Sequence, residues 1–234
     1  DELRNLTGQS LVRKLDDIIS QEKIDPSQLG KMELRREYNG YITYAVPGMA
    51  KDLEKAGAKY VYHSVSREED VLKIIESGGV SSTMSRIRQG IERPAGASML
   101  SGMNTGGADS AFTRVVTAKA QKDGKLFSGA SVSGDYQIKM SLDVMERTDY
   151  YSYTFDNFGN AGDISGSGKS PVDLVKSLNR SFGSSNEIMF RNGVDSRYFT
   201  EIMCRTSQER QNLLSELRAR GILDINGIAI EKFV

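Results

Sequence analysis

The stretch Tyr60-Val-Tyr-His-Ser-Val65 and the residues directly after it, 66–77, indicate the type of fold. Four of the six residues in the first segment are aromatic or β-branched, which is typical of a buried strand. In the second segment Ser66 and Glu69 have the spacing of a helix capping box, and apolar residues follow at helical spacing. The pair Gly78-Gly79 then ends the predicted helix. The sequence therefore predicts a strand that leads directly into a capped helix.

The segments on either side of that unit carry further helix and strand signals. Residues 1–58 are expected to form a polar, helical extension, whose last helix is predicted over residues 49–56 and closes at Gly57. Residues 59–234 form the main domain, and its further strands are expected at residues 111–118, 136–140, 150–155, 187–191, 197–204 and near 228–231. Further helices are expected at residues 82–89, 171–180 and 207–220. Because the strands outnumber the helices and the order is mixed, we predict an α+β fold with a largely antiparallel sheet.

The composition limits the possible chemistry. His63 is the only histidine, so the chain cannot build a His-rich metal site, and we predict no metal. Lys plus Arg equals Asp plus Glu, at 31 each, so no global field attracts nucleic acid or an acidic membrane. The cluster Arg86, Arg88 and Arg93 is interpreted as a solvated helix face.

The single cysteine, Cys204, ends an apolar run, which favours a buried structural thiol over a nucleophile. With one cysteine no intrachain disulfide can form, as is typical of a reducing compartment. No apolar stretch approaches the about 20 residues that span a bilayer, so we expect no membrane partner. The chain opens at Asp1, and we expect it to be part of a larger polypeptide.

The sequence of residues 163–170 is similar to the phosphate-binding loop motif, but it does not match the motif completely. The pattern needs a glycine where Asp163 stands, and a helix that opens at Lys169. The residue after Ser170 is a proline, and the residues before Asp163 are rich in Gly and Asn. We interpret this segment as a flexible loop.

Three strand ends carry side chains of more specific interest. His63 lies near the end of the first strand, Phe112 follows a Gly-rich lead-in to the second, and Glu187 opens a third directly after Asn186. Taken alone, a histidine at a strand end is more often a satisfied core residue, and a glutamate at a strand start is more often solvated. A purely structural His63 in an unrelated fold therefore remains an alternative.

In this combination and order, the chain resembles the ADP-ribosyltransferase superfamily in its His-aromatic-Glu branch. The similarity covers about residues 59–234 and leaves the N-terminal extension outside. The resemblance implies a split, two-sheet core that holds NAD, as co-substrate, in a cleft. It also implies that His63 bonds a ribose of the dinucleotide, and that Glu187 stabilises the oxocarbenium-like charge formed as the nicotinamide–ribose bond breaks.

The resemblance extends to neighbouring positions, with departures. Ser64 stands where the branch has a glycine whose backbone meets the nicotinamide amide, and Phe112 stands where it has a stacking tyrosine. Alternatively one of the tyrosines at 150, 151 and 153 supplies that ring. Arg114 is expected to reach the pyrophosphate, and Thr113 and Asn186 complete the expected NAD contacts.

The resemblance predicts an NAD-dependent mono-ADP-ribosyltransferase, a bacterial toxin or effector domain that is cytoplasmic or delivered into a target cell's cytoplasm. Its acceptor would be a protein or a nucleic acid. Ser185, two positions before Glu187, argues against an arginine acceptor, and water remains a possible acceptor, which would give NAD hydrolysis. The alternative is a degenerate member of the fold that binds a nucleotide or a protein, which Ser64 and Phe112 favour.

Overall fold

The computed structural model describes residues 48–82, 85, 110–117, 134–147, 150–153, 186–190 and 193–234. Several predictions fall outside these residues: most of the N-terminal extension, the helices at 82–89 (in all but a few positions) and 171–180, the loop at 163–170, the arginines Arg86, Arg88 and Arg93, and Ser185.

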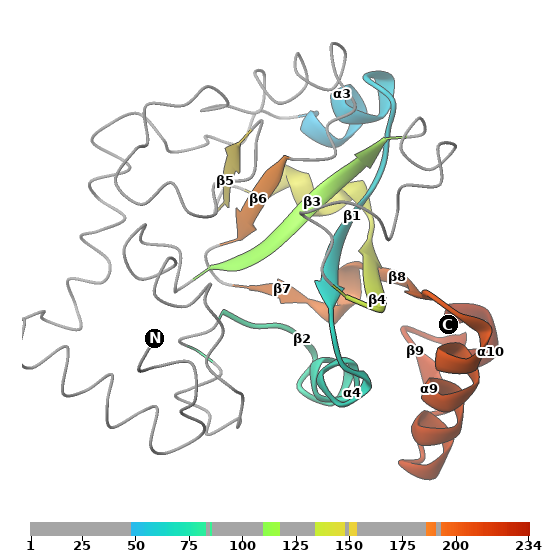
Figure 1. Cartoon of the computed structure of the whole chain (residues 1–234). Helices are drawn as coiled ribbons and strands as arrows, with labels where there is room; N and C mark the ends of the chain where they lie inside the picture. Colours follow the sequence, from blue (N-terminus) through green and yellow to red (C-terminus); the bar gives the residue numbers. More distant parts are fainter. Residues whose placement is uncertain are drawn as a thin grey trace, which may run out of the picture.

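The centre of the molecule is a six-stranded sheet in the order β5-β6-β3-β1-β4-β8 (Figure 1). Its strands are β1 Ala58–Val65, β3 Ala111–Thr117, β4 Tyr136–Met140, β5 Tyr150–Tyr153, β6 Glu187–Phe190 and β8 Phe199–Cys204. All neighbouring strands in it are antiparallel. The predicted α+β class with an antiparallel sheet is therefore confirmed.

The pairing of β3 divides this sheet into two parts. Residues 111–113 of β3 pair with β6, whereas residues 114–117 pair with β1 on the other side. One half of β3 thus belongs to the β5–β6 side, and the other half belongs to the side of β1, β4 and β8. The two parts of the sheet meet at Thr113 and Arg114.

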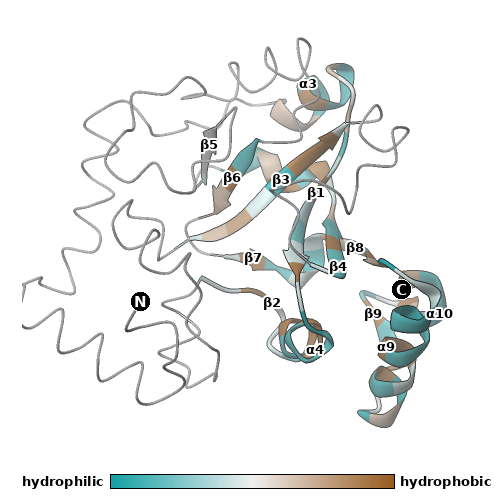
Figure 2. Cartoon of the chain, viewed as in Figure 1, coloured by the Kyte–Doolittle hydropathy of each residue, from teal (hydrophilic) through white to brown (hydrophobic). Residues whose placement is uncertain are grey.

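Helices cover one face of the sheet. They are α3 Met49–Lys55, α4 Glu68–Glu76, α9 Ser207–Ala219 and α10 Ile230–Phe233, with 3-10 turns at Leu142–Glu146 (η3) and Ser196–Tyr198 (η4). Leu53, Leu72, Leu213 and Phe233 from the four helices share one apolar core with the sheet. In Figure 2 the ribbons of α4 and α9 carry both brown and teal segments, as expected for helices with one apolar face.

Two small two-stranded sheets complete the fold. Strand β2 (Gly79–Val80) pairs with β7 (Val194–Asp195), and β9 (Asp224–Ile225) pairs with β10 (Ile228–Ala229). Gly79 and Gly193 allow the first pair to approach closely, because a Cβ on either would lie within 2.5 Å of a carbonyl oxygen across the pair. No helix in the described part of the chain is long and apolar enough to cross a bilayer.

The main core contains residues from both sides of the predicted boundary at residue 58. Met49 and Leu53 of α3 are buried in it, and the Glu146 carboxylate accepts hydrogen bonds from the backbone N–H groups of Gly48 and Ala50. The described end of the predicted extension therefore packs as part of the same unit as the sheet.

The two faces of the sheet differ in the residues that they carry. The core face carries Ala111, Val115, Ile138, Ile188, Phe190 and Ile202, all buried in the main core. The polar face carries Tyr60, Tyr62, Phe112, Arg114, Lys139, Glu187 and Glu201, which alternate with core residues along their strands. Tyr60, Tyr62 and Val116 form a small second apolar cluster on the polar face.

Most predicted elements are confirmed within one or two residues, but two local predictions are wrong. Helix α4 begins at Glu68 after the N-cap Arg67 and has no side-chain cap, so the predicted capping box of Ser66 and Glu69 does not form. The Arg67 guanidinium bonds the Asp70 carboxylate instead, at 2.9 and 3.0 Å. A capping box is present at α9, between Thr206 and Glu209, where none was predicted.

The second error concerns the end of the chain. The strand expected near residues 228–231 stops at Ala229, and Ile230 begins the short helix α10. Ile230 and Phe233 are fully buried in the main core. A helical turn brings both side chains to the same side, whereas a strand would send them to opposite faces.

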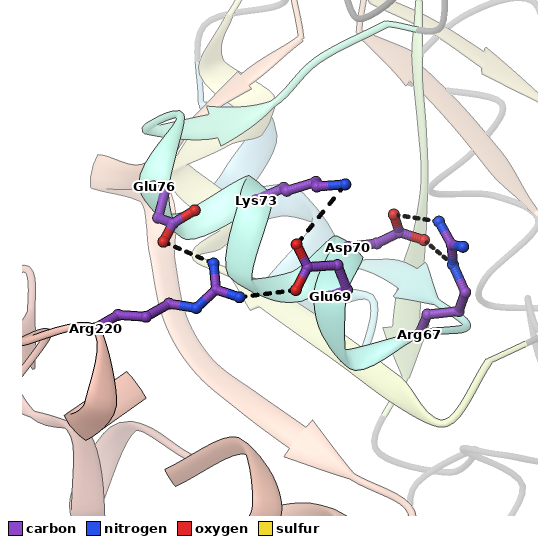
Figure 3. A network of polar contacts seen from close by, with 6 residues as sticks. All are labelled: Arg67, Glu69, Asp70, Lys73, Glu76 and Arg220. Atoms are coloured by element: carbon purple, nitrogen blue, oxygen red, sulfur yellow. Dashed lines mark hydrogen bonds and ion pairs between the residues drawn. The ribbon is translucent and has the colours of Figure 1, made fainter. Parts of the chain in front are cut away.

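Helix α9 is held against α4 by ion pairs as well as by apolar packing (Figure 3). The Arg220 guanidinium bonds the carboxylates of Glu69 and Glu76, at 2.8 and 2.9 Å, and Lys73 lies 3.8 Å from Glu69. These groups are partly exposed, so they contribute to the orientation of α9 more than to the free energy of unfolding.

Candidate functional site

The three strands expected to carry the site are neighbours in the sheet. Glu187 lies on β6, Phe112 on β3 and His63 on β1, in the order β6-β3-β1. Since neighbouring strands lie about 4.8 Å apart, the backbones of His63 and Glu187 are separated by roughly 10 Å across the sheet. Three segments that are far apart in sequence thus meet where β3 changes partners.

His63 is held by a hydrogen bond across to β3. Its Nδ1 lies 2.8 Å from the carbonyl oxygen of Phe112, and the side chain is half-buried. A carbonyl can only accept, so Nδ1 carries the proton, and in the neutral ring Nε2 is then the nitrogen with the acceptor lone pair. The contact lies just beyond the last β1–β3 pair, Tyr62 with Arg114, so the ring bridges the two strands where their ladder ends.

Glu187 is the first residue of β6, and only 6% of it is exposed. The next residue, Ile188, lies in the main core, so alternation along the strand places Glu187 on the polar face. Phe112 pairs with Met189 two residues further on and shares that face. The acid and the aromatic ring therefore lie on one side of the sheet, on adjacent strands.

Arg114 is placed opposite Glu187 by the contacts on either side of it. Thr113 pairs with Ile188, and the backbone of Val115 bonds the side chain of Asn186. Arg114 lies between Thr113 and Val115 on β3, and Glu187 lies between Asn186 and Ile188, so the register places Arg114 opposite Glu187. Residues opposite each other on one face of an antiparallel pair have their Cβ atoms about 5 Å apart. Arg114 also pairs with Tyr62 of β1.

The polar row continues across the sheet in a way that the sequence did not indicate. Tyr62 pairs with Lys139, and Lys139 pairs with Glu201, whose carboxylate lies 2.7 Å from the Lys139 ammonium. Lys139 also lies over the Tyr60 ring, 4.7 Å from its centroid. The tyrosines at alternating positions 60 and 62 were a signal for a second lined face, but only the register shows what stands beside them.

The His63 side chain leaves its strand on the core face, opposite to the face that carries Glu187. It pairs with Ile138, a core residue, so its Cβ lies on the core face while its ring turns to the Phe112 carbonyl. His63 and Glu187 therefore approach the β1–β3 junction from different sides of the sheet.

Two predicted NAD contacts have other roles in the structure. Thr113 is buried, and its hydroxyl donates to the Ile188 carbonyl at 3.0 Å. The Asn186 amide is fully buried and bonds the backbone of Val115 through both its oxygen and its nitrogen, at 2.8 and 2.9 Å. This geometry argues against a direct contact of either side chain with NAD, because their polar groups already join β3 to β6.

The alternative aromatic rings are only partly described. Tyr150 is buried against Phe190, with ring centroids 5.3 Å apart, and its hydroxyl donates to the Met145 carbonyl. Burial raises the pKa of this hydroxyl, and the negative charge of Glu146 adds to the rise. Tyr150 is therefore a core residue and does not supply the stacking ring. In backbone register, Tyr151 is opposite Met189 and Tyr153 is opposite Glu187.

Ser64 is half-exposed and lies where the backbone at Gly134 approaches the end of β1 closely. A Cβ on Gly134 would stand 2.7 Å from the Ser64 hydroxyl and 2.5 Å from the Val65 carbonyl oxygen. Any other residue at position 134 would push this end of β1 away. The glycine therefore sets the position of the strand end that follows His63.

Cys204 is not a nucleophile candidate. The side chain is partly buried, and this burial, followed by the negative charge of Glu209, raises the pKa of the thiol to about 12. A thiol with that pKa carries almost no thiolate at neutral pH, in agreement with the predicted structural role.

A separate pocket of about 550 Å³ opens at the other end of β1, between α3, η3 and the start of β8. Lys59, Tyr60 and Asp143 are among its lining residues, whereas His63, Phe112 and Glu187 are not. Among the described residues no group of three or more His, Cys, Asp or Glu side chains is arranged to hold a metal ion.

No protein-family model matches the chain, and no curated protein is similar to it at a significant level.

Proposed function

We propose that the protein is an NAD-dependent mono-ADP-ribosyltransferase whose site lies where β3 changes partner from β6 to β1. The observation that carries this proposal is a nearly buried carboxylate and an aromatic ring on one face of two adjacent strands. The single histidine reaches the same junction from the other face, where its ring is bonded to the backbone of β3. The division of β3 between two partners also supports the split core that the resemblance implies.

In this proposal, Glu187 carries the catalytic charge. The bond between nicotinamide and ribose C1′ breaks, its electron pair leaves with the nicotinamide, and the ribose gains oxocarbenium character. A carboxylate in a partly dry site stabilises that positive charge far more than one in water. The acceptor then forms a bond to C1′ and loses its proton to solvent. The acceptor is a protein, a nucleic acid or, in NAD hydrolysis, water.

The other residues bind and orient the dinucleotide. With Nδ1 committed to Phe112, the lone pair on Nε2 of His63 suits a ribose hydroxyl. The Phe112 ring, on the same face as Glu187, offers a surface on which nicotinamide can stack. Arg114 brings a positive charge suited to the pyrophosphate, and the backbone at Ser64 is suited to the carboxamide. Holding these parts in place lowers the entropy cost of the reaction. An effector role in a target cell's cytoplasm belongs to this proposal.

The test combines two variants and one control. The protein is incubated with NAD labelled in the adenylate and the nicotinamide parts, and both nicotinamide release and label transfer are measured. We expect Glu187→Gln to lower kcat by about 10²-fold or more with little change in KM, because charge stabilisation acts in the transition state. We expect His63→Ala mainly to raise KM. Glu216→Gln, the same chemical change on the exposed side of α9, should match the wild type.

Each part of the proposal can fail separately. If the wild type binds NAD but releases no nicotinamide, the enzyme is excluded and the chain is a nucleotide-binding module of this fold. If the wild type is active and Glu187→Gln is equally active, the assignment of the site is wrong.

A further inference from the structure

Asn186, the residue directly before β6, makes an unusual pair of contacts. It is fully buried, its Oδ1 accepts from the Val115 N–H at 2.8 Å, and its Nδ2 donates to the Val115 carbonyl at 2.9 Å. The orientation of the amide is determined by its partners, since an N–H needs an acceptor and a carbonyl needs a donor. The side chain thus takes the place of a backbone peptide and extends the β3–β6 pairing by one step.

The consequence falls on Glu187. The residue before Glu187, Asn186, is bonded to Val115. The residue after it, Ile188, pairs with Thr113, and the Ile188 carbonyl also accepts a hydrogen bond from the Thr113 hydroxyl at 3.0 Å. Strand ends usually fray because their last residues lack one neighbour. Here the first residue of the strand is held on both sides.

We propose that Asn186 is a positioning residue, whose amide joins the start of β6 to β3 and thereby fixes the carboxylate of Glu187. It acts through Glu187 and not by contact with NAD. This inference rests on the proposed function for its effect on catalysis. The position demands a short side chain that donates and accepts at once. An aspartate carboxylate only accepts hydrogen bonds, so one of its negative oxygens would face the partially negative oxygen of the Val115 carbonyl. Glutamine keeps the amide, but its side chain is longer by one methylene.

The first test compares Asn186→Asp with Asn212→Asp, which makes the same change on the exposed surface of α9. We expect Asn186→Asp to lower kcat for nicotinamide release by about 10- to 100-fold with KM for NAD within twofold, since a displacement near 1 Å costs about that much. Asn212→Asp should leave both values unchanged. A rise in KM at constant kcat in Asn186→Asp would mean that the amide contacts NAD, and it would overturn the proposal, as would wild-type kinetics.

The second readout does not depend on activity. Amide hydrogen exchange of Val115 and Glu187, followed by NMR in the free protein, should be slow in the wild type and at least about tenfold faster in Asn186→Asp. Unchanged exchange would overturn the proposed anchor. If the wild type releases no nicotinamide, the proposed function fails while the exchange result still decides whether Asn186 holds Glu187. If Asn186→Asp does not fold, the test uses Thr113→Val, which removes the hydrogen bond on the other side of Glu187. This variant should lower kcat and speed amide exchange at Glu187. No change in either quantity would overturn the proposal.

Discussion

The two faces of the central sheet are built from the same strands but use different interactions. On the core face, Val115, Ile138 and Ile188 are buried in the main core, to which four helices also contribute. On the polar face, the residues next to them in sequence, Arg114, Lys139 and Glu187, form part of a row of charged and aromatic side chains. Along each strand, the residues that stabilise the fold and the residues that carry polar chemistry are therefore direct neighbours. Apolar burial fixes the backbone, and the backbone then holds the polar groups in register.

The largest contrast is expected between two adjacent residues of β4. Ile138 is fully buried in the core, so Ile138→Ala should lower the free energy of unfolding by about 2–5 kcal/mol, through lost burial and a residual cavity. Lys139→Met, on the polar face, removes the ion pair to Glu201 and the contact with Tyr60 and should cost about 1 kcal/mol or less. Urea unfolding monitored by circular dichroism, at constant m value, measures both. Equal losses would mean that the two faces do not differ as described.

A smaller change in the free energy of unfolding is expected from the N-terminal cap of α9, one of the helices that share the main core with the sheet. Thr206 caps α9 by accepting from the Glu209 N–H at 3.2 Å, and the Glu209 carboxylate bonds the Thr206 N–H at 2.8 Å. Thr206→Ala should lower the free energy of unfolding by about 1 kcal/mol, whereas Thr206→Ser keeps the hydroxyl and should stay close to the wild type. The same urea titration measures both, and a loss of equal size in both variants would show that the cap is not the cause.

The smallest effect concerns the contact between α4 and α9. Burial raises the pKa of the Glu68 carboxyl above its ordinary value of 4.5, the negative charge of Glu216 raises it further, and the hydroxyl of Tyr136 opposes the rise. The folded protein therefore binds this proton more tightly than the unfolded chain does. The stability that protonated Glu68 contributes is complete below about pH 4.5, and it is lost as the pH rises through the raised pKa of the folded state.

We therefore expect Glu68→Gln to be slightly more stable than the wild type at pH 7 and equally stable near pH 4. Thermal unfolding across this pH range measures the difference. Glu216→Gln, which removes the second cause of the rise, should give part of the same gain. A gain that is largest at low pH would have the wrong sign and would contradict the assignment.

Much of the fold was predictable because local signals and tertiary structure agree. Strands β1 and β3 are rich in β-branched and aromatic residues, β4 alternates apolar and polar residues, and α9 has a clear apolar stripe. The capping box at Ser66 was a wrong prediction because the spacing of a serine and a glutamate does not decide which residue becomes the N-cap. Here the bond between Arg67 and Asp70 accompanies a helix start one position later than the box requires.

The candidate site was predictable only in part. The sequence indicated His63, Phe112 and Glu187 as strand-end residues, and their strands are neighbours. It did not show that Asn186 and Thr113 serve the backbone, because the partners of a short polar side chain depend on contacts more than 70 residues away. The tyrosines at positions 60 and 62 were a signal for a second lined face, but the sequence did not show which residues stand beside them in the row from Glu187 to Glu201. A shift of one residue in any register would send each of its side chains to the other face.

The amino-acid sequence alone indicated the kind and order of most elements, the single imidazole, and the alternation that gives the sheet two unlike faces. The division of β3 between β6 and β1, and the contact of the His63 ring with the Phe112 carbonyl at that division, could be seen only in the folded chain. The physical reason is the range of the forces involved. Propensity and periodicity act over a few neighbouring residues, whereas strand pairing is selected by burial and hydrogen bonding over the whole chain.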